Sequence, residues 1–440
     1  MRLGHEGTAR GQRQRGSDTR GQPRRWMPLL RRIIGTIFLL LAGCAARLAA
    51  PPSEPGTRRD PFFLTFWCGP PLADFDDARA VEIAAAGFTV VGPPCEGGSD
   101  PAGNLRALDI AARHGLRLWV SDPRFGAHAP ATPGWEAGVD AAVADYGQHP
   151  ALGGYFVDDE PSADEFEVPG QIVARLRRDD PTHLAYVNLL ADYGGRSNLG
   201  TDGYDDYLER FVDVVHPELL SYDYYPFLHD NDRTTFFHNL GKIRDLAARS
   251  HLPFLLIVQA MPHWVYRDPT EAELAWQAFH ALAFGARGIS YFAYWTPVDV
   301  KQADTMKFHY GLVEAGRPTL HYFQAARLNR VIHALASQLS GYRSLGVADS
   351  QAEIAPSFPV GPIDAIEGGP STAGLFAGSR GQLAVLLVNR DYRYGITARL
   401  ELHDGAVMPD VFDPTRERWR STRTLAFPLE PGGAQLLRWR

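Results

Sequence analysis

This chain of 440 residues has little cysteine and no surplus of positive charge. Only three cysteines are present, which excludes a disulfide-rich scaffold and disfavours a zinc site built on thiolates. The formal net charge is −7, whereas a nucleic-acid-binding protein needs a basic face, so no nucleic-acid partner is predicted. With 45% hydrophobic and 22% charged residues, the composition is that of a globular protein.

Several common catalytic signatures are absent as well. The chain has no His-Glu-x-x-His motif for a metallohydrolase and no Gly-x-Ser-x-Gly elbow for a serine esterase. It also lacks the glycine-rich loops, Gly-x-Gly-x-x-Gly and Gly-x-x-x-x-Gly-Lys-Ser/Thr, that cradle phosphates. The sequence therefore predicts neither a metal site nor a cofactor.

Positive charge is concentrated at the N-terminus. Residues 1–43 hold nine Arg against one Glu and one Asp, a local charge of +7 that leaves −14 for residues 44–440. An apolar run at 33–42 follows two of these arginines. It is too short to cross a bilayer, which takes about 20 apolar residues. A basic flank followed by a short apolar stretch and small residues predicts a secretory signal.

The sequence Leu-Ala-Gly-Cys at 41–44 resembles the bacterial lipoprotein box, whose cysteine is lipid-modified and becomes the first mature residue. The resemblance implies an exported protein held at the bacterial cell envelope, periplasmic or on the outer surface, by a lipid anchor on Cys44. A plain cleaved signal and an apolar anchor are the alternatives. Residues 1–43 would be the leader, and 44–58, rich in Ala and Pro, a tether.

Apolar strand patterns alternate with amphipathic helix patterns eight times between residues 59 and 341. Eight such units over about 280 residues match the size of a (β/α)8 barrel, an α/β fold. An open doubly wound sheet is disfavoured because its phosphate-binding turn is missing. Beyond residue 341, short alternating runs between turn residues predict a small antiparallel β-sandwich domain at 342–440. Strands are expected at 62–68, 88–93, 116–122, 152–159, 183–189, 219–225, 253–261 and 288–295.

Carboxylates and aromatic rings gather where these expected strands end, which is where barrel enzymes place their catalytic groups. Acids that protonate a leaving oxygen, beside rings on which sugars stack, are what glycoside cleavage requires. The sequence therefore predicts a carbohydrate ligand. The alternative is that the rings only close the barrel mouth. The predicted sugar-binding residues are Trp67, Asp122, Asp159, Asn188, Tyr225, Gln259, His263 and Trp295.

The sequence Gly-Tyr-Phe-Val-Asp-Asp-Glu-Pro at 154–161 resembles the Asn/Asp-Glu-Pro signature on strand four of the large barrel superfamily of glycoside hydrolases. Residues 285–295 are similar to the last barrel strand of family 42 β-galactosidases and of related uncharacterised bacterial glycosidases. The resemblance covers about 60–340 and implies that Glu160 is the general acid/base. The alternative for Glu160 is a salt-bridged residue at the barrel rim.

Strict alternation along this strand places Asp158 and Glu160 on one face and Asp159 on the other. A negative neighbour would raise the pKa of Glu160, which suits a general acid. We therefore expect one of the two aspartates to orient other side chains rather than to react.

The chain departs from these relatives at the seventh strand. Retaining members carry a nucleophilic Glu at its end, whereas this sequence has Gln259, whose neutral amide is a poor nucleophile. Three explanations are open. Another carboxylate is the nucleophile, the reaction inverts the anomeric carbon through a water molecule, or the barrel binds a glycan without cleaving it. We choose Asp223, at the end of the sixth expected strand, as the second catalytic carboxylate. The alternative for Asp223 is an Asp that accepts hydrogen bonds from loop amides.

If Cys44 carries the lipid, two other cysteines remain in the exported protein, Cys68 and Cys95. Both stand at the ends of neighbouring expected strands, which lie about 4.8 Å apart. That spacing suits a disulfide, and an oxidising compartment would allow one to form. Two buried thiols are the alternative.

Two functions remain in competition at this point. The first is an exported glycoside hydrolase, retaining or inverting, that uses Glu160 and Asp223. The second is a catalytically inactive glycan-binding lipoprotein, which Gln259 favours and Glu160 opposes. A purely structural envelope lipoprotein would not need a rim rich in carboxylates.

Overall fold

The computed structural model describes residues 62–439 except 97, 299–305 and 355–360. The leader, the tether and the lipidation candidate Cys44 lie outside the described residues. Among the residues described, none of the helices is long and apolar enough to cross a membrane.

Eight parallel strands form one sheet in the order β1-β8-β7-β6-β5-β4-β3-β2. The sheet curls until its first and last strands meet, where Thr89 donates its backbone N–H to the Leu64 carbonyl oxygen at 2.9 Å. Gly92 is needed there, because a Cβ would clash with the Phe66 carbonyl oxygen. The strands are β1 Phe63–Phe66, β2 Val90–Val91, β3 Arg117–Val120, β4 Leu152–Asp159, β5 Leu184–Leu189, β6 Leu220–Tyr224, β7 Phe254–Gln259 and β8 Gly288–Phe292.

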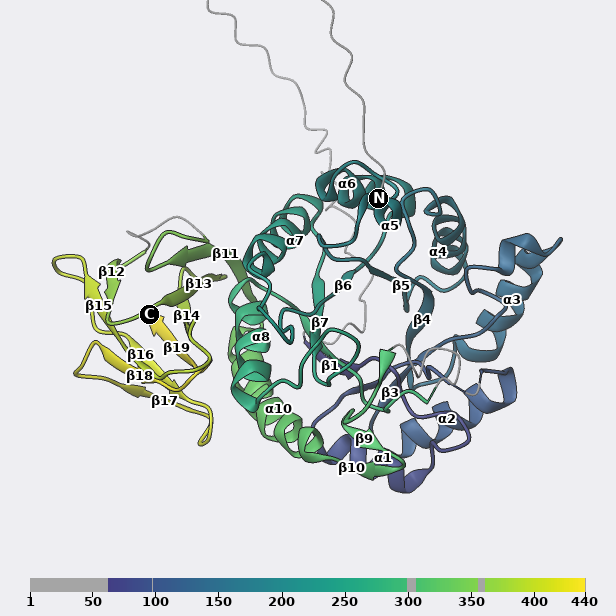
Figure 1. Ribbon diagram of the computed structural model, residues 1–440, viewed down its shortest axis with the longest axis horizontal. Helices are drawn as coiled ribbons and strands as arrows, with labels where there is room; N and C mark the ends of the chain where they lie inside the picture. Colours follow the sequence, from purple (N-terminus) through teal and green to yellow (C-terminus); the bar gives the residue numbers. More distant parts are fainter. Residues whose placement is uncertain (1–61, 97, 299–305, 355–360, 440) are drawn as a thin grey trace, which may run out of the picture. The chain divides into compact units, whose positions relative to one another are not determined.

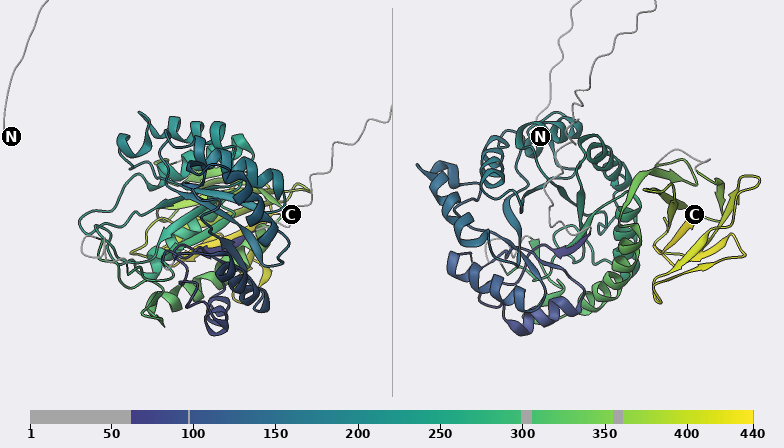
Figure 2. Two further views of the ribbon diagram at one scale, coloured as in Figure 1. Left: turned by 90° about the vertical axis from the view of Figure 1, so that its right-hand side faces the viewer. Right: turned by 180° about the vertical axis from the view of Figure 1, so that it is seen from behind.

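Helices surround this barrel on its outer side (Figure 1), and the view from behind shows the same ring (Figure 2). Their apolar faces pack on the outward side chains of the strands in one large core. Thr270 and Glu273 close a capping box at the start of α8. The helices are α1 Asp77–Ala85, α2 Pro101–Arg113, α3 Trp135–Tyr146, α4 Glu167–Asp179, α5 Arg196–Leu199, α6 Tyr204–Val215, α7 Phe236–Ser250, α8 Glu271–Ala283 and α10 Leu320–Leu339.

The inward side chains of the strands form a second, smaller core inside the barrel. Phe63, Trp119 and Tyr186 are among its members, and they alternate along their strands with residues that face the helices. This alternation decides which strand-end side chains reach the barrel mouth and which point outward.

Two antiparallel sheets follow the barrel and pack on each other around an apolar core, as the sandwich prediction required. The Trp276 indole N–H of α8 donates to the Arg390 carbonyl oxygen of this domain at 2.8 Å. The six-stranded sheet contains β11 Tyr342–Asp349, β13 Ser371–Gly378, β14 Leu383–Asn389, β19 Ala434–Trp439, β16 Asp410–Asp413 and β17 Arg418–Ser421. The three-stranded sheet contains β12 Ile363–Glu367, β15 Ile396–Leu402 and β18 Ala426–Leu429, and a separate short pair is formed by β9 Val313–Glu314 and β10 Arg317–Pro318.

Candidate active site

Three neighbouring strands, β4, β5 and β6, bring a group of carboxylates together at their C-terminal ends. Asp159 is paired in register with Asn188 of β5, and Asn188 is paired in register with Ser221 of β6. Asp223 lies two residues beyond Ser221 and therefore projects from the same face of β6. Glu160 follows β4 directly and donates its backbone N–H to the Asn188 carbonyl oxygen at 2.9 Å.

Asn188 holds this group in place. Its amide nitrogen Nδ2 is 3.2 Å from Asp159 Oδ1 and 3.1 Å from Asp223 Oδ1, so it donates to both carboxylates. Its Oδ1 accepts a hydrogen bond of 2.9 Å from the Ser221 hydroxyl. Because every polar atom of this amide has a protein partner, Asn188 orients the carboxylates and has little left to offer a sugar hydroxyl.

The expected alternation of Asp158, Asp159 and Glu160 is wrong. A bulge between Phe156 and Asp158 shifts the register of β4 against β5 by one residue. Asp159 therefore faces Asn188. Glu160 has a left-handed backbone with φ of 52°, which turns its side chain toward Asp223. Asp158 instead accepts the Asp159 backbone N–H at 2.9 Å.

Glu160 and Asp223 are directly hydrogen-bonded to each other. Burial, and next the negative charge of Asp223, raise the pKa of Glu160 well above its ordinary range. Asp223 is only 4% exposed, and burial raises its pKa too, although Glu160 beside it, the hydrogen bond from Asn188 and the nearby Tyr193 favour its charged form. Burial and the charge of Asp223 therefore both favour the protonated form of Glu160.

Asp159 is the third carboxylate of the group. It and Glu160 are exposed at the mouth, although protein atoms crowd both carboxyl groups, whereas Asp223 lies behind them. Crowding by protein atoms, followed by the charge of Asp223, raises the pKa of Asp159 to about 7. Asp159 can thus gain or lose a proton near neutral pH, which is the property of a general acid or base.

Aromatic rings form the walls beside these acids. Trp67 is partly buried at the end of β1 and meets Phe156 edge to face at 4.9 Å between ring centroids. Tyr225 contacts the rings of His263 and Phe292, each at 5.4 Å. His263 is buried, and burial lowers its pKa to about 4, so it is a neutral part of the wall rather than a base.

Three residues predicted to bind sugar do not reach this group. Asp122 projects from β3 toward α3, where Tyr146 donates to it at 2.6 Å and Arg124 at 2.8 Å. It points outward because Trp119, three residues earlier on β3, points into the barrel. Trp295 packs with the outer core and lies under the Arg79 guanidinium of α1, 5.2 Å from the ring centroid.

Gln259 is the third of these corrections. Its side chain is fully buried, and its amide accepts from the Phe227 backbone N–H at 2.9 Å. The same amide donates to the carbonyl oxygens of Phe227 and Arg267 at 3.0 and 2.8 Å. Gln259 therefore holds the two loops that follow β6 and β7 and offers nothing to a ligand.

Sequence reasoning missed Tyr193 and Trp264. Tyr193 lies in the loop after β5, close to Asp223, and favours the charged form of that carboxylate. Trp264 is in the loop after β7, is 54% exposed and has a left-handed backbone with φ of 45°. Both residues lie several positions after the end of a strand. Only the residues at the strand ends were considered from the sequence. Aromatic residues in a loop at the catalytic face were the available signal.

A disulfide joins Cys68, just after β1, to Cys95, just after β2, with their Cα atoms 4.6 Å apart. Cys68 packs with Met261 and Ala293, and Trp67 packs against this cluster. The bridge thus fastens the same end of the barrel that carries the carboxylates. In the part of the chain that the structure describes, no group of three or more His, Cys, Asp or Glu could hold a metal ion.

The barrel fold of this chain is similar to that of solved glycoside hydrolase structures. A family 5 glycoside hydrolase from Bacteroides vulgatus matches it with a TM-score of 0.53 at 13% identity, over 86% of this chain and 89% of that one. A second glycoside hydrolase matches with a TM-score of 0.51 at 12% identity, over 86% of this chain and 92% of that one. The chain spans 60% of the length of a third match, a β-galactosidase from the psychrophilic Marinomonas ef1 (TM-score 0.48, 12% identity, 63% of this chain). No family model and no curated protein matches the sequence.

Proposed function

We propose that this protein is an exported, lipid-anchored glycoside hydrolase in which Glu160 is the general acid. The observation that carries the proposal is the hydrogen-bonded pair of Glu160 and Asp223 at the C-terminal ends of β4 and β6. This is the end where barrel enzymes carry their chemistry. Aromatic walls that could stack on a sugar border the pair. The shared fold with glycoside hydrolases supports the class of reaction as analogy.

In this proposal the three carboxyl groups of Asp159, Glu160 and Asp223 have different roles. Protonated Glu160 gives its proton to the glycosidic oxygen as the bond between that oxygen and the anomeric carbon breaks. Asp223 cannot flank the same carbon while it is hydrogen-bonded to Glu160, because even a retaining pair of carboxyl groups stands about 5–5.5 Å apart. Asp223 therefore keeps Glu160 protonated and oriented, and this refines its assignment as the second catalytic carboxylate.

Asp159 is the better candidate for the base. It is exposed, and its pKa of about 7 matches the range in which a carboxylate can take a proton from water. In this scheme the water oxygen bonds to the anomeric carbon, its proton goes to Asp159, and the configuration at that carbon inverts. The anomer first released, followed by NMR, tests this point, and a retained configuration would return the nucleophile's role to Asp223.

A screen of aryl glycosides and bacterial polysaccharides tests the proposed activity. Glu160→Gln is expected to lower kcat/KM by about 10²- to 10⁴-fold, the usual contribution of a general acid. Glu165→Gln is a matched control, since Glu165 stands on the same loop and bonds only the Ser162 backbone and hydroxyl. Equal activity of wild type and Glu160→Gln on any cleaved substrate would refute the assignment.

A glycan-binding protein without catalysis is the second candidate, and Gln259 favours it. Its buried, fully bonded amide stands where retaining relatives of the resembled family carry their nucleophile. Saturable binding of a polysaccharide without product, unchanged in Glu160→Gln, would establish this function. The anchor is tested by the mass of the mature N-terminus, and an unmodified Cys44 in the membrane fraction would refute it.

A further inference from the structure

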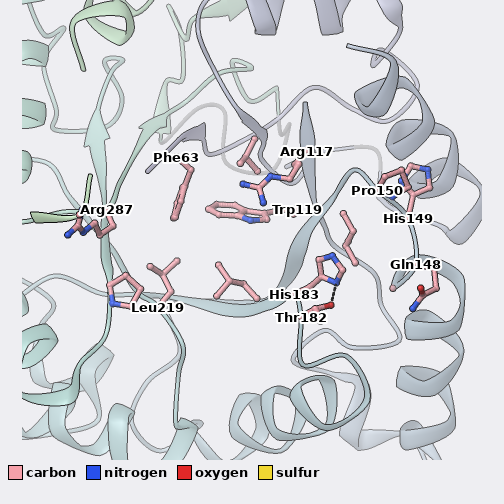
Figure 3. Close-up of a pocket in the computed structure, with 17 residues that line it drawn as sticks. Phe63, Arg117, Trp119, Gln148, His149, Pro150, Thr182, His183, Leu219 and Arg287 are labelled. Atoms are coloured by element: carbon pink, nitrogen blue, oxygen red, sulfur yellow. Dashed lines mark hydrogen bonds between the residues drawn. The ribbon is translucent and has the colours of Figure 1, made fainter. Parts of the chain in front are cut away.

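Arginines lie at both ends of the barrel, but their surroundings differ. A cavity of about 830 Å³ at the N-terminal ends of the strands is lined in part by Arg117, Arg287 and two histidines, and by no Asp or Glu (Figure 3). Arg287 donates to the Tyr342 carbonyl oxygen at 2.6 Å, so its guanidinium serves the contact with the C-terminal domain. Arg233 belongs to the opposite end, in the loop that follows β6, where its guanidinium lies over an aromatic ring.

The loop after β6 is folded so that Arg233 returns to the barrel mouth. The Arg233 backbone N–H donates to the Pro226 carbonyl oxygen at 2.7 Å, which closes the loop onto its own start. The guanidinium carbon lies 3.8 Å from the ring centroid of Tyr193 and 5.8 Å from that of Tyr266. Its Nη2 also donates to the Tyr266 hydroxyl at 3.4 Å. Arg233 thus connects the loops that follow β5, β6 and β7.

Tyr193, the residue under this guanidinium, lies against the end of β6. Its ring meets that of Tyr224 edge to face at 5.1 Å between centroids, and its hydroxyl accepts the Tyr225 backbone N–H at 3.4 Å. Asp223 precedes these two residues in the chain, and Tyr193 favours the charged form of its carboxylate. A tilt of the Tyr193 ring would therefore move its hydroxyl relative to Asp223, the partner of Glu160.

Arg233 is itself held in place by the residue that precedes it. Asp232 accepts hydrogen bonds from Arg267 at 3.1 Å and from the Tyr392 hydroxyl of the C-terminal domain. Arg267 in turn donates to Glu273 of α8 at 2.6 Å. Asp232 therefore fastens the loop after β6 to the C-terminal domain, and Arg233 fastens the same loop to the barrel mouth.

We propose that Arg233 is a positioning residue of the proposed active site: its guanidinium holds the Tyr193 ring so that the Tyr193 hydroxyl stays beside Asp223. The attraction between a cation and the face of an aromatic ring supplies the force, and a flat guanidinium stacks on a ring better than an ammonium does. In this scheme Arg233 touches no reacting atom and acts only through Tyr193. Its role in the reaction rests on the proposed glycosidase activity, whereas the placement of Tyr193 does not.

Fluorine NMR of the full-length protein, labelled with meta-fluorotyrosine, tests the placement without a substrate. The Tyr193 resonance is the one that disappears in Tyr193→Phe. Arg233→Met keeps an unbranched side chain but removes the charge and the flat guanidinium, so it should move this resonance by more than its linewidth. Arg233→Lys keeps the charge and should move it less. A Tyr193 resonance that is the same in Arg233→Met and in the wild type would overturn the proposal.

Kinetics on any cleaved glycan test whether Arg233 acts through Tyr193. Arg233→Met is expected to lower kcat about tenfold, the size of a strong contact between a cation and a ring, and to change KM by less than about twofold. The same change made in Tyr193→Phe should lower kcat no further, because the hydroxyl that Arg233 holds is already gone. Arg244→Met is the matched control, since Arg244 lies over the Phe284 ring, 6.0 Å from its centroid, on α7.

The outcomes separate this inference from the proposed function. If the wild type cleaves no glycan, the proposed function fails, and the fluorine spectra still decide whether Arg233 holds Tyr193. If a glycan is cleaved, an unchanged kcat in Arg233→Met, or an equal loss of kcat with and without the Tyr193 hydroxyl, would overturn the role of Arg233. Thermal melting verifies the fold of each variant, and Arg233→Lys, with a smaller expected loss of kcat, replaces Arg233→Met if that variant does not fold.

Discussion

The two ends of the barrel differ in charge although the same eight strands build both. The C-terminal end carries Asp159, Glu160 and Asp223, whereas the lining of the N-terminal cavity has Arg117 and Arg287 and no acid. In a parallel barrel every strand gives its first residue to one end and its last residue to the other. Charge can therefore be separated along the barrel axis without any change to the apolar middle.

The difference between the ends also concerns how each charge is compensated. At the acidic end, a hydrogen bond from Asn188 and the nearby Tyr193 favour the charged form of Asp223, whose charge in turn favours the protonated form of Glu160. At the basic end, Arg287 has only a carbonyl partner among the described residues. The acidic end thus gathers carboxyl groups that act on one another's protonation, and the lining at the other end contains no carboxyl group.

Asp223→Asn tests the acidic end and is expected to have the largest effect. Loss of the negative charge removes one cause of the raised pKa of Glu160, so Glu160 would lose its proton at a lower pH. We expect kcat/KM at pH 7 to fall by about 100-fold and the alkaline limb of the pH–rate profile to move to lower pH.

Asp192→Asn is the control for that experiment, because Asp192, in the loop after β5, is a neighbouring carboxylate that does not act on Glu160. An alkaline limb that stays in place in Asp223→Asn would mean that Asp223 does not control the proton of Glu160. The acidic end would then not act as a unit.

Reduction of the disulfide between Cys68 and Cys95 should have the next largest effect. The bridge spans 27 residues, and a loop of that length stabilises a fold by about 3.5 kcal/mol. Reductant should therefore lower the Tm of the wild type and leave that of a Cys68→Ala, Cys95→Ala double variant unchanged.

The same reduction tests the acidic mouth of the barrel. The bridge lies beside Trp67 there, so reductant should lower the activity at temperatures below the Tm. Unchanged activity in the reduced protein would show that the bridge does not position the mouth.

The sequence predicted the barrel because strand and helix periods repeat through the chain. It also placed Glu160 and Asp223 at one end, since both stand where a parallel strand finishes. It could not predict which face of β4 carries Asp159, because that depends on a bulge. A bulge cannot be recognised from the alternation of residue types along a strand. The left-handed backbone of Glu160 is equally invisible in the residue types.

The predicted residues that lie away from the carboxylates are held there for a different physical reason. Asp122 and Gln259 do stand at strand ends, but nearby groups use their hydrogen-bonding capacity: Arg124 and Tyr146 in one case, loop backbone in the other. A polar residue at a strand end is therefore only a candidate for ligand binding. Hydrogen-bond partners from distant segments of the chain decide whether its side chain is free to bind a ligand. The cationic cavity was missed because only the C-terminal strand ends were searched.

Asp159→Asn should produce the smallest change, a pH-dependent gain in stability. The pKa of Asp159 is about 7 in the fold and about 3.8 as an ordinary Asp. Below pH 3.8 both folded and unfolded states hold the proton, so the group contributes nothing. Between pH 3.8 and 7, Asp159 is ionised in the unfolded state but still protonated in the folded state, so the free energy of unfolding falls as the pH rises. Above pH 7 this loss is complete.

Since Asn has no charge at any of these pH values, the substitution removes that loss. We expect the Tm to rise by a few degrees at pH 8 and to stay unchanged at pH 3.5, measured by calorimetry beside Asp230→Asn on the exposed surface. Arg287→Gln at the other end should show no such difference between the two pH values, because arginine stays charged at both. A Tm gain in Asp159→Asn that is equal at both pH values would mean that crowded charge at the acidic mouth is not what costs stability there.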